Sequence, residues 1–128
     1  MKNKFSKLIS TGSYLPSKIY TNHDIEKLVD TSHEWIVERT GIEQRHIAEE
    51  NESSVDMAFQ ASLIALNNAG LNANDIDMIV LATTTPERKF PSTAVLLQNM
   101  LQNNNACAFD INAACTGFIF ALDIADKY

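Results

Sequence analysis

At 128 residues the chain has the length of about one domain, and its 45% hydrophobic and 20% charged residues are ordinary for a soluble globular protein. The net charge of −6 argues against nucleic acid as the main partner, because binding to phosphate groups requires clustered lysine and arginine. The basic N-terminal residues are followed by no long apolar run, and no apolar stretch reaches membrane-spanning length. We therefore expect a cytoplasmic protein that binds neither nucleic acid nor a membrane.

The N-terminal third predicts a strand followed by two short helices. Residues 5–15 have the apolar content of a strand that runs into a loop. Residues 21–24 have the spacing of a capping box and predict a helix over 25–29. A similar signal at 31–34 predicts a second helix, which ends near Gly41.

The rest of the chain predicts an alternation of helices and strands. A polar and exposed segment at 43–51 leads to Ser53, which opens the clearest helix, and Gly70 is well placed to end it. The later elements are expected in this order: a turn at 72–75, a strand at 77–82, a loop at 83–91, a helix at 93–101 capped by Ser92, a strand at 106–110 and a helix at 115–128. This alternation implies an α/β protein with layered α-β-α architecture and a mixed, mainly parallel sheet.

The segment around Cys115 carries the strongest chemical signal. The thiol is expected at the N-terminus of the last helix, where unpaired N–H groups and a partial positive charge favour the nucleophilic thiolate. Small neighbours, Ala113, Ala114 and Gly117, leave room for a substrate. The residues alone nevertheless favour a buried packing role for Cys115, and also for Cys107, because free cysteine is among the most buried residue types.

The spacing of the two cysteines does not indicate a metal site. Their spacing matches neither a zinc site nor a disulfide framework, so we expect two free thiols in a reducing compartment. The histidines all lie in the polar first third of the chain, and sequence spacing does not place them near Cys115. We expect no bound metal and no cofactor.

Five segments in order along the chain carry a resemblance to a known family: residues 11–16, 35–48, 77–84, 90–94 and 109–118. Together they resemble the N-terminal part of a β-ketoacyl-acyl carrier protein synthase III, a condensing enzyme of the thiolase fold. The resemblance implies that residues 1–128 form the first, N-terminal half-domain of a thiolase-like fold. It also implies that the C-terminal half is absent and that the chain stops within or just after the helix that follows the nucleophile.

The resemblance implies a decarboxylating Claisen condensation. An acyl group, typically acetyl from acetyl-CoA, is transferred to Cys115 as a thioester. Malonyl-acyl carrier protein then loses carbon dioxide, and the resulting carbanion attacks the thioester to give a β-ketoacyl-acyl carrier protein, the first elongation product of type II fatty-acid synthesis. The developing negative charge requires electrostatic stabilisation, to which the backbone N–H of Cys115 is expected to contribute.

The resemblance also assigns binding residues. Trp35 is expected to stack on the adenine of CoA, with Arg39 and Thr40 lining the same site, since indole stacks on a purine and guanidinium pairs with phosphate. The alternative is that Trp35 packs its helix onto the core and that Arg39 is solvated. Phe90 is expected to reach across a dimer interface and bound the acyl pocket, and the alternative is a loop aromatic that anchors Pro91.

The resemblance covers only part of the family's length. The catalytic His and Asn of the family, and most of the basic residues that dock acyl carrier protein, lie in the second half, so we expect residues 1–128 alone not to condense. A homodimer is expected through the strand near 106–110, since an uncovered edge strand is a template for pairing. Two alternatives stay open: a sibling condensing enzyme of the hydroxymethylglutaryl-CoA synthase or polyketide starter type, and a catalytically inert half-domain that dimerises or binds CoA.

Overall fold

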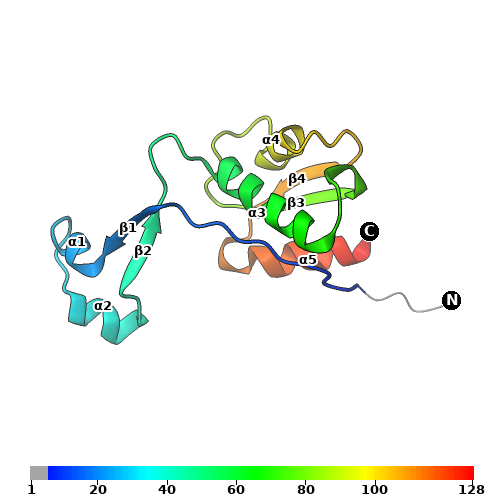
Figure 1. Cartoon of the computed structure of the whole chain (residues 1–128). Coiled ribbons are helices and arrows are strands. Elements are labelled where there is room, and N and C mark those ends of the chain that lie inside the picture. Colours follow the sequence, from blue (N-terminus) through cyan, green and yellow to red (C-terminus); the bar gives the residue numbers. More distant parts are fainter. Residues whose placement is uncertain (1–5) are drawn as a thin grey trace. The chain divides into compact units, whose positions relative to one another are not determined.

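The computed structural model describes residues 6–128, which divide into two compact units (Figure 1). The first, here called the small unit, comprises Leu15–Glu52. The second, here called the large unit, comprises Ser53–Tyr128 together with the described residues before Leu15. Each unit holds one pair of strands and has its own helices.

The small unit is built on an antiparallel pair of strands, in the element order β1 (Lys18–Thr21), α1 (Asn22–Glu26), α2 (His33–Thr40) and β2 (Gln44–Ile47). The predicted capping box is confirmed, because Thr21 and Asp24 exchange hydrogen bonds at the start of α1. The helix itself lies a few residues earlier than expected. Helix α2 is capped by Ser32 and ends at Gly41, whose φ of 69° is in the left-handed region that glycine tolerates best.

Strand β2 was not expected from the sequence, where residues 43–51 suggested an exposed polar segment. Its residues carry long polar side chains, which hide the alternation that normally reveals a strand. Pairing with β1 satisfies its backbone, with Lys18 opposite Ile47 and Thr21 opposite Gln44. The strand is therefore a product of tertiary pairing rather than of its own sequence.

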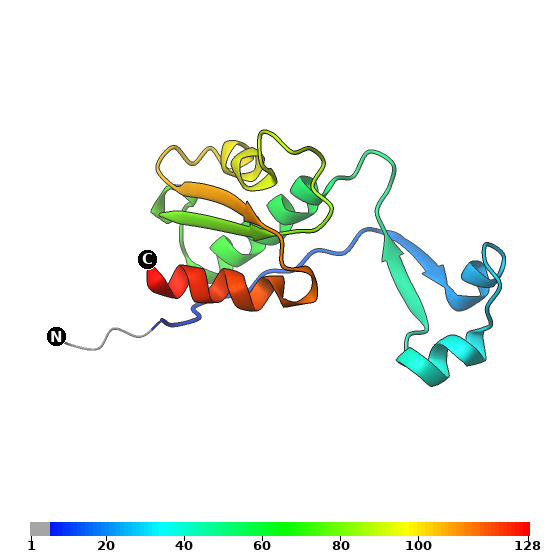
Figure 2. The ribbon, with the colours of Figure 1, turned by 180° about the vertical axis from the view of Figure 1, so that it is seen from behind.

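The large unit has the predicted alternation of helices and strands, in the order α3 (Ser54–Ala69), η1 (Ala73–Asp75), β3 (Met78–Ala82), α4 (Thr93–Met100), β4 (Cys107–Ile111), η2 (Ala114–Thr116) and α5 (Gly117–Lys127). Strands β3 and β4 pair in parallel, with Met78 opposite Cys107 and Ala82 opposite Ile111. Both views show this strand pair between α4 and α5 (Figure 1, Figure 2), so the predicted β-α-β unit with helices on both sides is confirmed.

The best-packed part of the large unit lies where α3 and α4 meet beside the strands. Val55 of α3 and Ala94 and Leu97 of α4 are buried. The predicted caps of α3 are confirmed: Ser53 and Asp56 form a capping box, and Gly70 ends the helix with a φ of 66°. The caps in the sequence and the buried side chains thus favour the same position for α3, and this consistency is typical of a stable scaffold.

The strand expected over residues 5–15 is wrong for the described residues 6–15, which form an extended coil, and residue 5 lies outside the described part. A strand requires a neighbouring strand to take its backbone hydrogen bonds, whereas this segment runs along α3. The hydroxyl of Ser10 donates to the carbonyl of Ala65 at 2.7 Å. A Cβ on Gly12 would lie 2.1 Å from the carbonyl oxygen of Ala61, so glycine is needed for this close approach.

Candidate active site around Cys115

Cys115 lies in a tight connection between β4 and α5. It occupies the 3₁₀ turn η2, so α5 begins at Gly117, two residues later than expected. Ala114, directly before the thiol, has a φ of 46°, an uncommon left-handed conformation for a residue with a side chain. The turn leaves Cys115 exposed, and Cys107 at the start of β4 is exposed as well. The buried packing role that the residues alone favoured is therefore wrong for both cysteines.

The backbone at Cys115 leaves one N–H group available for a ligand. Helix α5 has no side-chain cap at its N-cap residue, Thr116, whose hydroxyl instead donates to the carbonyl of Ala113 at 2.7 Å. The amides of Thr116 and Gly117 close the 3₁₀ turn on Ala113 and Ala114. Within residues 6–128, the amide of Cys115 donates to no backbone carbonyl. When a thiolate attacks a carbonyl carbon, the carbonyl oxygen becomes negatively charged. A free amide beside the thiol can donate a hydrogen bond to that oxygen and stabilise it.

A close contact sets the position of α5 against the strands. A Cβ on the buried Gly117 would lie 2.9 Å from the Cβ of Ala82, which ends β3. Glycine is required here for space, because its backbone has ordinary right-handed helical angles. Cys115 thus follows the carboxyl end of β4 while α5 rests on the carboxyl end of β3, the edge at which ligands bind in open α/β sheets.

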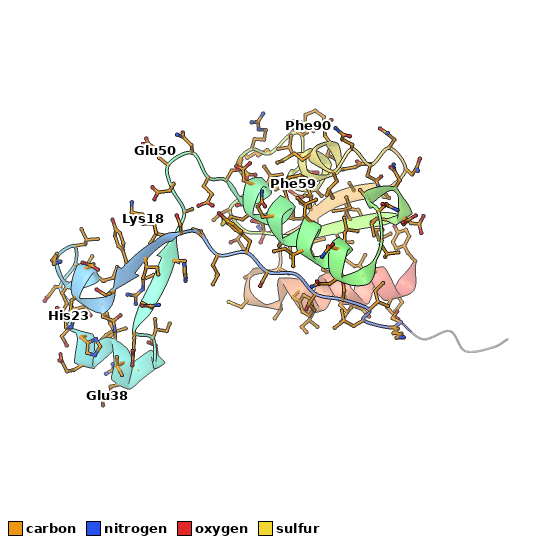
Figure 3. All side chains as sticks on the ribbon, viewed as in Figure 1. Lys18, His23, Glu38, Glu50, Phe59 and Phe90 are labelled. Carbon is orange, nitrogen blue, oxygen red and sulfur yellow. The ribbon has the colours of Figure 1, made fainter. Side chains whose placement is uncertain are left out.

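Phe90 is carried by the connection that follows the neighbouring strand. It lies in the loop between β3 and α4 (Figure 3), and 89% of its surface is exposed. Phe90 is thus a loop aromatic, as both the acyl-pocket role and the alternative role beside Pro91 require, and its exposure leaves the ring available to a partner. Phe90 and Cys115 therefore both follow the carboxyl ends of adjacent parallel strands in the large unit.

Trp35 and Arg39 form a pair on α2 in the small unit. The guanidinium carbon of Arg39 lies 4.9 Å from the centroid of the Trp35 ring, which is within cation–π range. Trp35 is 53% exposed, and the buried residue of this helix is instead Ile36. The packing alternative is therefore not supported for Trp35, whose indole remains accessible for stacking.

A hollow of about 690 Å³ lies beside this pair and is lined by Ile25, Val29, Asp30, Thr31, Ser32, Trp35 and Ile36. Its walls come from α1, from α2 and from the segment between them. One exposed aromatic face with a neighbouring guanidinium provides the two features that a nucleotide requires, a stacking surface and a partner for phosphate.

The third residue assigned to the CoA site, Thr40, has a structural role here. Its hydroxyl donates to the carbonyl of Ile36 at 2.7 Å and accepts from the amide of Ile42 at 3.1 Å. The first bond lies within the last turn of α2, and the second joins the end of this helix to the residue after Gly41. A contact between Thr40 and CoA stays a prediction.

Two carboxylates near Phe90 were not singled out by the sequence patterns. Asp110 on β4 accepts hydrogen bonds from the amides of Thr93 and Ala94, at 2.8 and 2.7 Å, and so caps α4 from a distance in sequence. Glu87 bonds to the start of α3 and to Thr93. Asp110 could have been singled out in the sequence, because an acidic residue near the end of an otherwise apolar strand is unusual. No feature of the sequence around Glu87 indicated a role for its side chain.

Within residues 6–128, no group of three or more His, Cys, Asp or Glu side chains is arranged to hold a metal ion. Over the same residues, no helix combines the length and the apolar character needed to cross a membrane.

Comparison with curated proteins gives similar relatives that are named as β-ketoacyl-acyl carrier protein synthases III. The chain is 54% identical over 125 residues to the "Beta-ketoacyl-[acyl-carrier-protein] synthase III" of Ehrlichia canis. The aligned region covers 98% of this chain and 39% of that protein. The chain is also 54% identical over 127 residues to the protein of the same name from Xanthomonas oryzae pv. oryzae, again covering 39% of that protein. The chain therefore spans about two fifths of the length of these curated relatives.

Solved structures give the same result. The 3-oxoacyl-[acyl-carrier-protein] synthase III of Aquifex aeolicus superposes with a TM-score of 0.89 at 55% identity, covering 93% of this chain and 38% of that structure. A priming β-ketosynthase from a polyketide biosynthetic pathway superposes with a TM-score of 0.93 at 39% identity, covering 97% of this chain and 37% of that one. No family model matches the chain. The resemblance and the thiolase-like α/β fold expected from the sequence are confirmed.

Proposed function

We propose that this chain, which is similar over nearly its whole length to β-ketoacyl-acyl carrier protein synthases III, is the N-terminal, nucleophile-bearing part of such a synthase. One observation carries the proposal beyond similarity: the exposed thiol of Cys115 stands on a strand-to-helix turn beside a backbone amide without a backbone acceptor. Neither feature is expected of a cysteine that serves packing.

The proposed chemistry begins with attack of the Cys115 thiolate on the carbonyl carbon of acetyl-CoA. The C–S bond to CoA breaks, CoA leaves as a thiolate, and the acetyl group stays on Cys115 as a thioester. The free amide of Cys115 stabilises the oxyanion of each tetrahedral intermediate. A carbanion formed by decarboxylation of malonyl-acyl carrier protein then attacks the thioester, releases Cys115 and gives the β-ketoacyl product of the first step of fatty-acid synthesis.

Trp35 and Arg39 are proposed to bind the nucleotide part of CoA, and Phe90 to bound the acyl pocket of a partner subunit. The support is the accessible indole with its adjacent guanidinium, the hollow beside them, and the exposure of Phe90. Thr40 is proposed to keep the end of α2 in place for this site. CoA enters as a substrate, so no cofactor is proposed.

The condensation step is proposed to need groups outside residues 1–128. The resemblance places the catalytic His and Asn, and most of the basic residues that dock acyl carrier protein, in the second half of the family's length, whereas the chain spans about two fifths of its relatives. We therefore propose that residues 1–128 alone undergo at most weak acylation of Cys115 and do not condense. Incubation of the chain with labelled acetyl-CoA and malonyl-acyl carrier protein tests this, and labelled β-ketoacyl product would refute it.

Dimerisation is proposed through β4. Within the described residues this strand pairs only with β3, so its other edge carries unpaired backbone groups. A monomer in light scattering of the complete synthase would count against this partner. The proposed compartment is the cytoplasm, where both thiols remain reduced.

The test of the nucleophile has a matched control in the other cysteine of the chain. Both thiols are exposed, but Cys107 begins β4 and Cys115 lies in the turn η2 that follows this strand. After exposure to acetyl-CoA, mass spectrometry is expected to find one acetyl group on Cys115 in the parent chain and in Cys107→Ala, and none in Cys115→Ala. An adduct on Cys107, or acetylation that survives in Cys115→Ala, would overturn the assignment.

A second candidate is a starter enzyme of polyketide synthesis, which the similarity to a priming β-ketosynthase favours. The nucleophile and first step are then the same, and the preferred acyl group differs. Competition between acetyl-CoA and longer acyl-CoA in the complete enzyme separates the two. Retained CoA binding without any acyl adduct on Cys115 would instead indicate an inert binding module.

A further inference from the structure

The loop that carries Phe90 is closed at its base by a hydrogen bond between side chains. The hydroxyl of Thr93, the first residue of α4, donates to Oε2 of Glu87 at 3.1 Å. Thr93 is fully buried, so this end of the bond is fixed by the surrounding packing. The bond closes residues 87–93 into a small loop, and Phe90 stands midway along it, projecting outward beside α4 (Figure 3).

The same carboxylate joins the loop to a second helix. Oε1 of Glu87 accepts from the amide of Val55 at 2.8 Å, in the first turn of α3. Burial raises the pKa of Glu87, but hydrogen bonds from its own amide, from the amides of Val55 and Ser54 and from Thr93 outweigh it and hold the pKa below its usual value. Although much of the side chain is exposed, the carboxylate is thus ionised and bonded through both oxygens.

Helix capping alone does not account for Glu87. In α3 the capping box of Ser53 and Asp56 leaves the amide of Val55 to Glu87, so that bond is a cap, whereas the first amides of α4 are already satisfied by Ser92 and Asp110. The bond from Glu87 to Thr93 adds no cap to α4, because it is accepted from a hydroxyl and not from an amide. Its distinct effect is on the loop, whose two ends it holds together.

The closed loop is also connected to the strand that leads to Cys115. The amide of Thr93 donates to Asp110 of β4 at 2.8 Å, and the amide of Thr83 donates to the carbonyl of Ile111 at 3.1 Å. Both ends of the connection between β3 and α4 are therefore tied to β4 a few residues before the nucleophile. These bonds hold the two ends of the connection on β4, and the bond between Glu87 and Thr93 closes the segment between them that carries Phe90.

We propose that Glu87 and Thr93 are positioning residues that set how far Phe90 projects and thereby the length of acyl chain that the synthase accepts. This inference rests on the proposed function, since it takes Phe90 as a wall of the acyl pocket. Loss of the bond lets the loop open and the aromatic ring recede, which lengthens the pocket. The substrates gained are acyl-CoA thioesters with more methylene groups than acetyl-CoA.

The first test measures loop opening without reference to activity. Arg88 and Lys89 lie within the closed loop and are exposed, so trypsin reports its opening. Cleavage there, relative to cleavage at Arg45 in the small unit, is expected to rise about tenfold in Glu87→Ala and in Thr93→Val, since a hydrogen bond to a charged group stabilises the closed form by about that factor. Ser53→Ala, which weakens the α3 cap and leaves the Glu87–Thr93 bond, is expected to keep the ratio of the parent chain.

The second test measures selectivity in the complete synthase that carries this segment. The ratio of kcat/KM for hexanoyl-CoA to that for acetyl-CoA is expected to rise at least about tenfold in Glu87→Ala and Thr93→Val, because one methylene accommodated in a hydrophobic pocket changes such a ratio by about 10–200-fold. The double variant is expected to resemble Glu87→Ala, since that variant already removes the bond to Thr93 together with the bond to Val55. Ser53→Ala is expected to leave the ratio unchanged.

The two tests separate the two proposals. Unchanged trypsin ratios in Glu87→Ala and Thr93→Val overturn the inference whatever the enzyme does. Faster loop cleavage with unchanged acyl selectivity overturns it as well, and so does a selectivity shift in Ser53→Ala, which would trace selectivity to general stability. A parent synthase that forms no β-ketoacyl product refutes the proposed function, and faster loop cleavage in the same variants then leaves only the structural role of the bond.

Discussion

Helices α4 and α5 pack on the same pair of strands, but they differ at their first turns and on their outer faces. Helix α4 begins with a capping serine and a carboxylate from a neighbouring strand, and it buries Thr93, Ala94 and Leu97. Helix α5 begins without a side-chain cap and exposes Phe118, Ile119, Phe120 and Leu122. The capped helix stabilises the scaffold, whereas the uncapped one follows a turn with one free amide at Cys115 and presents an apolar face to its surroundings.

The largest expected difference between the two helices concerns one leucine in each. Leu97→Ala should lower the free energy of unfolding by about 2–5 kcal/mol, because the side chain is only 5% exposed and its removal leaves a cavity. Leu122→Ala, at a site that is 49% exposed, should cost less than about 1 kcal/mol in the 128-residue chain. Urea denaturation measures both. Equal losses would show that α5 is packed as tightly as α4.

The next effect concerns how closely α5 approaches β3. Gly117→Ala should destabilise the chain by about 1–3 kcal/mol, since its new Cβ would lie 2.9 Å from the Cβ of Ala82. Adding Ala82→Gly should recover part of that loss, and a double-mutant cycle by thermal unfolding measures the coupling. Additive losses in the cycle would mean that this contact does not set the position of the helix.

A smaller effect should distinguish capped from uncapped first turns. Ser53→Ala and Ser92→Ala should each cost about 1 kcal/mol, because each hydroxyl accepts from an amide in its helix. Thr116→Ala should cost clearly less, since the Thr116 hydroxyl donates to Ala113 and caps no amide. Chemical denaturation of the three variants gives the comparison, and a loss at Thr116 as large as at Ser53 would contradict it.

The smallest effect is a pH dependence at the capped helix α3. Hydrogen bonds from the Ser53 hydroxyl and amide lower the pKa of Asp56 below its usual value of 3.8. Because the folded-state pKa is the lower one, the stabilisation is complete above about pH 4 and is lost as the pH falls through the depressed pKa. The stability difference between the parent chain and Ser53→Ala should therefore shrink below pH 4 in unfolding curves. A difference that is constant from pH 7 to pH 2 would exclude this linkage.

The sequence allowed much of the candidate site to be predicted. The position of Cys115 after a strand and before a helix follows from hydrophobic patterning, and the cap serines and Gly41 and Gly70 follow from their places at helix ends. The five segments of the resemblance pointed to the correct relatives. These features are local, so they can be read without knowledge of what lies nearby.

The missed features all depend on residues that are distant in sequence. Strand β2 exists because β1 pairs with it, and the segment at 6–15 is no strand because it lies along α3. Asp110 and Glu87 acquire their roles only when the starts of α3 and α4 come within reach of their carboxylates. Polar side chains that bond across the fold carry no periodic signal in the sequence.

The sequence by itself determined the order of the elements after Ser53, the helix caps and the identity of the residue at the turn, because each depends on neighbours within about one helical turn. Only the tertiary structure decided whether the thiol is buried or accessible. The short 3₁₀ turn, the left-handed Ala114 and the close approach of Gly117 to Ala82 bring Cys115 to the surface beside a free amide. The exposure of a side chain is set by what packs against it, and that is a property of the assembled fold.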